Sequence, residues 1–529
     1  MKKYIIIALS LFFLGTLNAQ TLYDGADLSN KGLSGTARFV GMGGAMGALG
    51  GDISTIGSNP AGIGIYRSND VMTSVSFSTH EIETKYDGNK FSNTRNRAHF
   101  DNFGIVFSNN MGRYNTLRFV NFAFNYNRAK TFYRTREMNG LMGGSQVDQM
   151  ITQANNAYDI DENGNGGYDL VEYGDAGYNL FDVNGIGWLS AIGYEGFLFD
   201  PVDGGFGAHW TGKPQGHFYS RESGGINQYD FNLSFNLIDR VYLGLSIGAY
   251  DVDYKKYSFY GENLYHADTS TSDENYDLHS NKWIDGAGFD FKFGLIVRPF
   301  EESPFRFGVA VHTPTFYKLT LGAESMLSST IYLVNNQNQE VLENKRVYTS
   351  DGLGRMEKDY RLRTPWKFNL SLGHTIGSQL ALGAEYEYQD NSSINFKHPS
   401  GGGPMDHETN VASEFLKGVH TLRLGAEYNI IPQFAFRVGY NYSTTGFEKN
   451  AFKELATNAI ETDTDYANEE ALNRFTLGFG YRGKSLYGDL GYQFNHYKEK
   501  FYTFDHKDLQ SASTTNSKSQ VVVTVGLRF

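Results

Sequence analysis

The C-terminal stretch Gln520-Val-Val-Val-Thr-Val-Gly-Leu-Arg-Phe529 alternates apolar side chains with polar or small ones at nearly every position. Successive side chains of a β-strand point to opposite faces, so a period of two gathers the apolar groups on one face. The stretch therefore predicts a strand with one apolar face and one mixed face. The apolar face holds Val521, Val523, Val525, Leu527 and Phe529, and the other face holds Gln520, Thr524, Gly526 and Arg528.

The same pattern recurs along the chain in about fourteen segments of roughly ten residues each. The connections between these segments alternate strictly between short turns and long polar loops. Barrels of the outer membrane combine tight periplasmic turns with long outer loops, whereas a soluble sandwich gives no reason for this alternation. The segments are predicted at residues 70–79, 100–109, 117–128, 227–237, 240–251, 287–298, 305–317, 362–374, 379–390, 419–429, 433–443, 473–482, 485–496 and 519–529, and the long loops at residues 80–99, 129–226, 252–286, 318–361, 391–418, 444–472 and 497–518.

The predicted fold is therefore all-β, an antiparallel transmembrane β-barrel of about 14 strands formed by residues 70–529 with long extracellular loops. An even number of strands places both chain ends on the periplasmic side. The 36 Tyr and 40 Phe suit the aromatic girdles of such a barrel. A soluble exported β-protein is the alternative, but its outward strand faces would expose large apolar patches to water.

The composition excludes several other classes of protein. The 529 residues include no Cys, and 46 Lys and Arg against 58 Asp and Glu give a formal net charge of −12. The missing Cys excludes disulfide scaffolds, thiolate metal sites and cysteine nucleophiles. The acidic balance argues against a nucleic-acid partner, because phosphates are bound by clustered basic residues.

The first residues, MKKYIIIALSLFFLGTLNAQ, have the pattern of a secretory signal peptide. Lys2 and Lys3 are positive, the apolar run that follows is too short to span a bilayer, and Ala19 is a small residue suited to signal peptidase. We expect residues 1–19 to be removed, with a retained membrane anchor as the alternative. Export together with a barrel predicts a location in the bacterial outer membrane.

Residues 20–69 do not alternate and are rich in glycine. No Walker lysine follows the glycines, so a phosphate-binding loop is not supported. Glycines let one backbone approach another closely, and an Asn-Pro pair makes a rigid turn. This composition predicts a compact plug that fills the lumen of the barrel.

Two motifs in this plug carry a resemblance to a known family. The segment Ala37-Arg-Phe-Val-Gly41-Met-Gly43-Gly44-Ala45, followed by Asn59-Pro60-Ala61-Gly62, resembles the N-terminal hatch of the long-chain fatty-acid transporter (FadL) family, which also includes toluene and xylene channels. The family's barrel has fourteen strands, the number counted above. The resemblance extends in order along the chain through Thr364-Pro-Trp366, Gly383-Ala-Glu-Tyr-Glu-Tyr388, Leu424-Gly-Ala-Glu-Tyr428, Arg437-Val-Gly-Tyr440 and Thr476-Leu-Gly-Phe-Gly-Tyr481, and it identifies Gly41, Gly43, Gly44, Asn59, Pro60 and Ala61 as the hatch motif.

The resemblance implies a function in transport. Members of the family take up hydrophobic or amphipathic, fatty-acid-like molecules passively, so the expected partners are such a ligand and outer-membrane lipid, with a monomeric barrel and no required cofactor. A shift of the hatch would open the path, and the ligand would leave sideways into the membrane near a kinked third strand. In this sequence that strand is predicted at about residues 117–128.

Two other functions stay open at this point. The barrel could be a scaffold for secretion or surface-protein attachment, or an outer-membrane lipid hydrolase. No nucleophile can be assigned near the lone inward His312, so the sequence favours a protein that is not an enzyme. An apolar pocket beside the hatch would favour transport, a filled lumen would favour the scaffold, and a Ser/His/acid cluster at the outer rim would favour the hydrolase.

The longest predicted loop contains a motif with calcium-loop spacing, D-x-N-x-N-G-x₅-E. Calcium requires six to eight oxygen ligands, which such a loop supplies from alternate positions and from a final bidentate Glu. A helix is predicted at residues 145–158, before the motif. The alternative is a polar, glycine-rich loop with chance spacing, and the sequence leaves both open. The candidate ligands are Asp161, Asn163, Asn165, Asp169 and Glu172.

Charged residues on the inward parity of the predicted strands have two interpretations. They could steer the head group of a ligand, or they could form a ladder of salt bridges that fills the lumen, which is the interpretation that we favour. The residues are Glu385, Glu387, Arg423, Glu427, Arg437 and Asp489.

Overall fold

The structure is a computed structural model that describes residues 21–112, 114–159, 167–208, 213–264, 274–334, 337–351, 356–399 and 402–529. The predicted signal peptide therefore lies outside the described residues. No helix within these ranges is long and apolar enough to cross a membrane.

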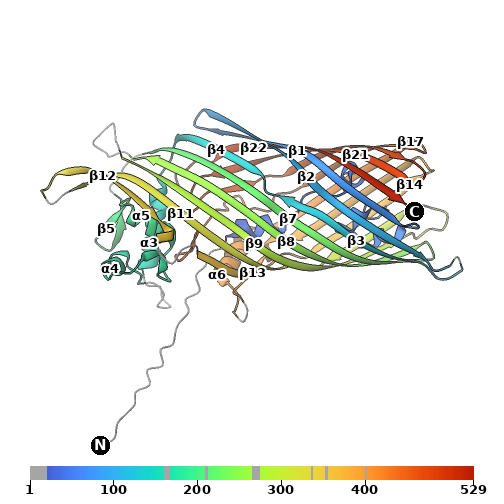
Figure 1. Ribbon diagram of the computed structural model, residues 1–529, viewed down its shortest axis with the longest axis horizontal. Helices are drawn as coiled ribbons and strands as arrows, with labels where there is room; N and C mark the ends of the chain where they lie inside the picture. Colours follow the sequence, from blue (N-terminus) through green and yellow to red (C-terminus); the bar gives the residue numbers. More distant parts are fainter. Residues whose placement is uncertain are drawn as a thin grey trace, which may run out of the picture.

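One antiparallel sheet closes into a barrel, because β1 pairs with β2 on one side and with β22 on the other (Figure 1). Three wall strands are interrupted and continue as β3/β4, β10/β11 and β13/β14. With these joined, the wall has the predicted fourteen strands. They are β1 (Asp70–Tyr86), β2 (Asn89–Asn110), β3 (Leu117–Thr131) with β4 (Arg134–Leu141), β7 (Gln215–Leu237), β8 (Val241–Asn263), β9 (Asn275–Val297), β10 (Arg306–His312) with β11 (Phe316–Val334), β13 (Met356–Arg363) with β14 (Lys367–Ile376), β15 (Leu380–Asp390), β17 (Gly418–Ile431), β18 (Phe434–Ser443), β20 (Leu472–Arg482), β21 (Leu486–Tyr502) and β22 (Ala512–Arg528).

The alternation of the C-terminal stretch is confirmed. Val521 and Val525 are 40% and 48% exposed and point outward, whereas Thr524 between them is buried. Large apolar side chains face outward in the same way on the other wall strands, and they form a continuous apolar belt around the barrel. Such a belt belongs in lipid, so the fold is that of a transmembrane barrel.

Several of the predicted long loops are wrong, because the strands continue well beyond the apolar belt. β1 and β2 run on to a turn at Asp87-Gly88, where both residues have positive φ, so the predicted loop at residues 80–99 is a hairpin. β8 and β9 extend likewise through much of residues 252–286. Outside the membrane both faces of a strand can be polar, so the period-two apolar signal disappears although the backbone ladder continues.

The described residues between β4 and β7 form a small cap at the end of the barrel opposite the short turns (Figure 1). The predicted helix at residues 145–158 is confirmed as α3 (Gln146–Tyr158), which begins with a capping box at Ser145. The other elements of the cap are α4 (Leu170–Asp175), η3 (Leu180–Asp182), α5 (Trp188–Glu195), β5 (Asp200–Val202) and β6 (Gly205–Gly207). Short elements of the remaining outer connections are β12 (Glu340–Tyr348), η4 (Thr349–Asp351), η5 (Asn391–Ser393), β16 (Asn395–Lys397), α6 (Asp406–Phe415) and β19 (Tyr466–Glu469).

The N-terminal segment lies inside the barrel, as the plug prediction requires (Figure 1). It contains α1 (Leu22–Ser29), α2 (Ala37–Gly41), η1 (Ile53–Gly57) and η2 (Pro60–Ile65). We call residues 30–69 of this segment the hatch and treat α1 separately. α1 lies nearer the outer end of the barrel than the hatch does. At that end it packs against α6.

Candidate functional site

Wall glycines bring the hatch and the barrel into direct backbone contact. A side chain at Gly383 would overlap the carbonyl of Ala45, and one at Gly425 would overlap the carbonyl of Met42. In the hatch, a Cβ at Gly41 would stand only 3.0 Å from the Cα of Gly478. The inward glycines are therefore required by close approach, which leaves no room for a solvent layer between hatch and wall.

The predicted salt-bridge ladder is present, and it also holds the hatch. Arg437 on β18 pairs with Glu427 and with Asp489, each at 2.6 Å. Glu427 accepts two further hydrogen bonds from Arg38 of α2, at 2.8 and 3.0 Å. Arg437 is fully buried, so these charges compensate one another in the absence of bulk water.

A second part of the ladder lies on β15 and β17. Arg423 pairs with Glu385 and, at 3.0 Å, with Glu387. The other oxygen of Glu385 accepts a hydrogen bond of 3.0 Å from the backbone of Gly47 in the hatch. Breaking either part of the ladder would thus loosen the hatch as well as the wall.

The Asn59-Pro60-Ala61 turn is docked on the wall near the short turns. The Asn59 side chain accepts from the Ala61 N–H at 3.1 Å, which caps η2, and donates to the Leu295 carbonyl at 3.2 Å. The Pro60 carbonyl accepts from Ser234 on β7 at 3.0 Å. The turn therefore bridges the hatch to β7 and β9.

Gly43 and Gly44 have φ values of 61° and 79°, in the left-handed region that favours glycine. They turn the chain directly after α2, so that the hatch can follow the inner wall. Together with Gly41 they account physically for the glycines of the motif. Their role in gating stays a prediction.

His312 contacts the hatch through its imidazole ring. Its Nε2 lies 3.1 Å from the carbonyl of Ser58, which also accepts from Asn369 at 3.3 Å. This buried imidazole thus satisfies a backbone carbonyl next to the Asn-Pro turn.

A cavity of about 200 Å³ lies on the outer side of the hatch. Its floor is formed by residues 30–34 and by Ser54, Gly57 and Ser58, and its walls come from strands around the barrel. The lining is mainly polar. Lys31, Lys292, Lys367, Arg423 and Arg474 supply cations, and Asp290, Glu387, Glu469 and Glu470 supply carboxylates.

Among the described residues, the lumen is therefore neither filled nor lined by a purely apolar pocket, which are two of the three outcomes considered from the sequence. Apolar groups also line the cavity, among them Leu33, Phe39, Val419 and Phe447. Lys31 lies 3.8 Å from the centre of the Tyr250 ring, where it makes a cation–π contact. The sequence analysis did not identify the lysines of this cavity. Lys367 could have been identified, because it lies at an inward position of its strand.

The wall beside the cavity has a break in its hydrogen-bond ladder. β2 pairs with β3 only from Asn102 to Asn110, and among the described residues no backbone pairing joins β2 to β4. The β3–β7 register shifts between Arg128 and Lys130, and a side chain at Gly225 on β7 would crowd the Lys130 carbonyl. The third strand is thus bent at Ala129, a residue that also lines the cavity.

Tyr133 occupies this break, between the end of β3 and the start of β4. Arg97 lies 4.4 Å from the centre of its ring, and His80 contacts its carbonyl oxygen at 3.3 Å. Across this break, side-chain contacts and no backbone pairs join β2 to β4 in the part of the chain that the structure describes.

The calcium motif is only partly covered by the structure. Asp161, Asn163 and Asn165 lie outside the described residues. Asp169 caps α4 by accepting a 2.8 Å hydrogen bond from Val171, and Glu172 lies in the first turn of that helix. Among the described residues no cluster of three or more potential ligands could hold a metal ion. The calcium site stays a prediction.

Comparison with known proteins identifies the fold. No protein-family profile and no curated protein sequence matches the chain. A FadL homologue from Pseudomonas aeruginosa has a similar structure, with 13% identity over 94% of this chain and 99% of that chain and a TM-score of 0.51. The toluene transporter TodX from Pseudomonas putida matches at 11% identity over 95% of this chain and 100% of that chain, with a TM-score of 0.47. The chain therefore has the fold of a FadL-type barrel with its N-terminal segment inside.

Proposed function

We propose that the protein is an outer-membrane channel for the passive uptake of amphipathic small molecules, gated by the hatch, with lateral release into the membrane. The observation that carries this proposal is the cavity between the hatch and the broken ladder. Ala129 and Asn127 line the cavity and lie on β3, close to the point where the backbone pairing between β2 and β3 ends. A ligand in this cavity has a short route to lipid that avoids the periplasmic half of the lumen.

The lining favours an amphipathic ligand over a pure hydrocarbon. A hydrocarbon would displace water from Lys31, Lys367 and Arg474 without replacing its hydrogen bonds, which is unfavourable. A molecule with a polar head can satisfy these groups, and its apolar part gains by leaving water for lipid. The similarity of the fold to the FadL homologue supports transport as the general function.

The gating proposal is supported by the contacts of the hatch. Many separate polar contacts hold it, among them Arg38 to Glu427, Gly47 to Glu385 and Asn59 to Leu295. Each tie is local, so a modest shift of the hatch can exchange it for water. The scaffold alternative is less favoured because the barrel encloses a cavity that a scaffold does not need.

The proposal is tested by narrowing the cavity. Ala129→Trp places a large side chain beside the broken ladder, and we expect uptake of a labelled long-chain fatty acid to fall at least tenfold. Ala249→Trp is the matched control, because Ala249 is exposed on the outward face of β8. Both variants must keep the heat-modifiable gel mobility of a folded barrel. Equal uptake by the two folded variants would contradict the proposed route.

A further inference from the structure

A stretch of irregular chain lies buried in the outer mouth of the barrel. Residues 459–465 belong to the connection between β18 and β20 and have no helix or strand structure, yet each of them is buried. Five of these seven residues are polar or charged, namely Glu461, Thr462, Asp463, Thr464 and Asp465. Buried irregular chain of this polarity needs specific partners, because each unpaired group costs desolvation energy.

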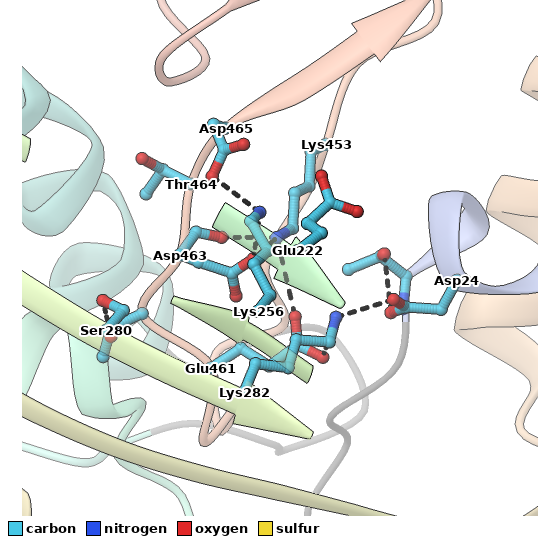
Figure 2. Close-up of polar contacts among 12 residues, drawn as sticks. Asp24, Glu222, Lys256, Ser280, Lys282, Lys453, Glu461, Asp463, Thr464 and Asp465 are labelled. Carbon is cyan, nitrogen blue, oxygen red and sulfur yellow. Dashed lines mark hydrogen bonds and ion pairs between the residues drawn. The ribbon is translucent and has the colours of Figure 1, made fainter. Parts of the chain in front are cut away.

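Two lysines of the barrel wall and Lys453 of the same connection supply these partners (Figure 2). Lys256 on β8 pairs with Asp463 and with Asp465, each at 2.7 Å. Lys282 on the neighbouring strand β9 pairs with Glu461 at 2.9 Å. Both lysines are less than a tenth exposed, so the pairs are largely withdrawn from water.

The same Lys282 also reaches the N-terminal helix. Its Nζ lies 2.6 Å from a carboxylate oxygen of Asp24 in α1, so one ammonium group joins α1 to residues 459–465 (Figure 2). Tyr23 of α1 stacks on Phe447 with ring centres 5.3 Å apart and donates a 2.7 Å hydrogen bond to Asn468. The N-terminal helix is thus attached to both ends of the same connection.

Neutral hydrogen bonds also hold residues 459–465 in place. The Thr462 hydroxyl lies 2.6 Å from that of Ser280 on β9, and Thr464 accepts from Gln146 of α3 at 2.7 Å. The backbone N–H of Trp188, at the start of α5, donates to the Ala459 carbonyl at 2.9 Å. Ile460 belongs to one apolar core that also includes residues of α1, α3 and α5. The mouth is therefore packed, and the polar cavity lies between this packing and the hatch.

We propose that residues 459–465, which we call the outer plug, form an outer gate of the channel. Lys282 couples the outer plug to the N-terminal segment, so that the two ends of the cavity open together. The charges suit a switch of this kind. Removing one partner of a buried ion pair leaves the other uncompensated, so movement of either side weakens the seating of the other. The consequence for transport rests on the proposed function, whereas the coupling itself does not.

The coupling is tested with thiol reporters, which are clean because the chain has no native Cys. Thr462→Cys reports on the outer plug and Ser29→Cys on α1, and both sites are buried. A membrane-impermeant maleimide applied to intact cells should label each slowly in the otherwise native protein. Glu461→Gln removes the charge that pairs with Lys282 on the side of the plug, together with its pair to Lys453, and Asp24→Asn removes the charge that pairs with Lys282 on the side of α1.

We expect either variant to raise labelling at both reporters at least tenfold. Lys85→Met, which removes a surface ion pair with Glu83, is the control and should change neither rate. Labelling that rises only at the reporter next to the altered carboxylate would overturn the coupling. Retained heat-modifiable mobility shows that the barrel is folded, and Lys282→Arg, which keeps the charge, should label like the native protein.

The gate itself is tested by locking it. The adjacent hydroxyls of Ser280 and Thr462 allow a disulfide in the double variant Ser280→Cys/Thr462→Cys. Oxidation should reduce uptake of a labelled amphiphile at least tenfold, and a reductant should restore it. Full uptake by the oxidised form would overturn the gate. If the native protein does not take up the amphiphile, the proposed function fails for that molecule, while the labelling experiment still decides the coupling.

Discussion

Arg38 of the hatch and Glu427 of β17 are joined by two hydrogen bonds, Nε to Oε2 at 2.8 Å and Nη2 to Oε1 at 3.0 Å. The geometry is bidentate, which matches the planar guanidinium to the carboxylate. Arg437 pairs with the same Oε2 atom from the other side at 2.6 Å. This carboxylate is therefore the point at which the hatch and the barrel wall share a charge.

Glu427→Gln should release the hatch and weaken the barrel. It leaves two arginines beside a neutral amide, and an uncompensated buried charge costs about 3–5 kcal/mol. Arg38→Ala should release the hatch with a smaller loss of barrel stability, because Arg437 keeps both of its carboxylate partners. Urea unfolding in detergent and leakage of a small antibiotic into cells measure the two effects. Equal barrel stability in the two variants would contradict this division of roles.

Asn59→Ala should loosen the hatch without preventing assembly of the barrel. The variant loses the cap on Ala61 and the bond to Leu295, at about 1–3 kcal/mol for the groups left unpaired. Asn59→Ser is the matched control, since a serine hydroxyl can cap η2 without introducing a charge and should cost less. Limited proteolysis of the hatch ranks the three proteins. A hatch that is cut equally fast in all of them would show that the turn does not hold it.

The orientation of the barrel can be read from thiol labelling at its two ends. Cys at Ser378 or Lys484, in the short turns, should be protected from an impermeant reagent in intact cells. Cys at Asn89 or Glu340, on the outer hairpins, should react at once. All four sites are exposed, so access to the reagent and not burial decides the outcome. Equal labelling of both sets would contradict the orientation.

The calcium prediction is tested at Glu172, which would supply the bidentate ligand. Glu172→Ala should make residues 129–226 more sensitive to protease, and a chelator should abolish the difference between the variant and the native protein. Asp169 is unsuitable for this test, because its loss removes the cap of α4 whether or not calcium binds. A native loop that is equally sensitive with and without calcium would make the spacing accidental.

The membrane-embedded wall could be predicted from the sequence because lipid imposes a strict rule on it. Every outward residue in the belt must be apolar, which gives Val521, Val523 and Val525 their spacing. Outside the membrane, outward residues need not be apolar. The continuation of β1 and β2 to Asp87-Gly88 therefore shows no alternation of apolar and polar residues in the sequence. Backbone pairing there depends on the partner strand, which a local pattern does not contain.

The hatch could be located from its composition, but the packing of the mouth could not be predicted. Positive φ at Gly43 and Gly44 and the Asn-Pro turn are local properties that leave a mark in the sequence. The ion pair between Asp24 and Lys282 joins residues 258 positions apart, and neither residue has an unusual neighbour in the chain. The sequence predicts only a long loop at residues 444–472 for the outer plug, because the burial of the plug arises wholly from tertiary contacts.

The last prediction concerns the glycines that let the hatch touch the wall. Gly383→Ala would push a methyl group into the Ala45 carbonyl, and such overpacking costs about 1–3 kcal/mol. Gly488→Ala is the matched control, since its nearest neighbour, the Thr524 carbonyl oxygen, would lie 3.8 Å from the new methyl group. Gly383→Ala should expose the hatch to protease and admit small polar solutes, while the barrel stays folded because no ladder bond is lost. If Gly383→Ala and Gly488→Ala behave alike in proteolysis and leakage, close backbone approach does not seal the lumen.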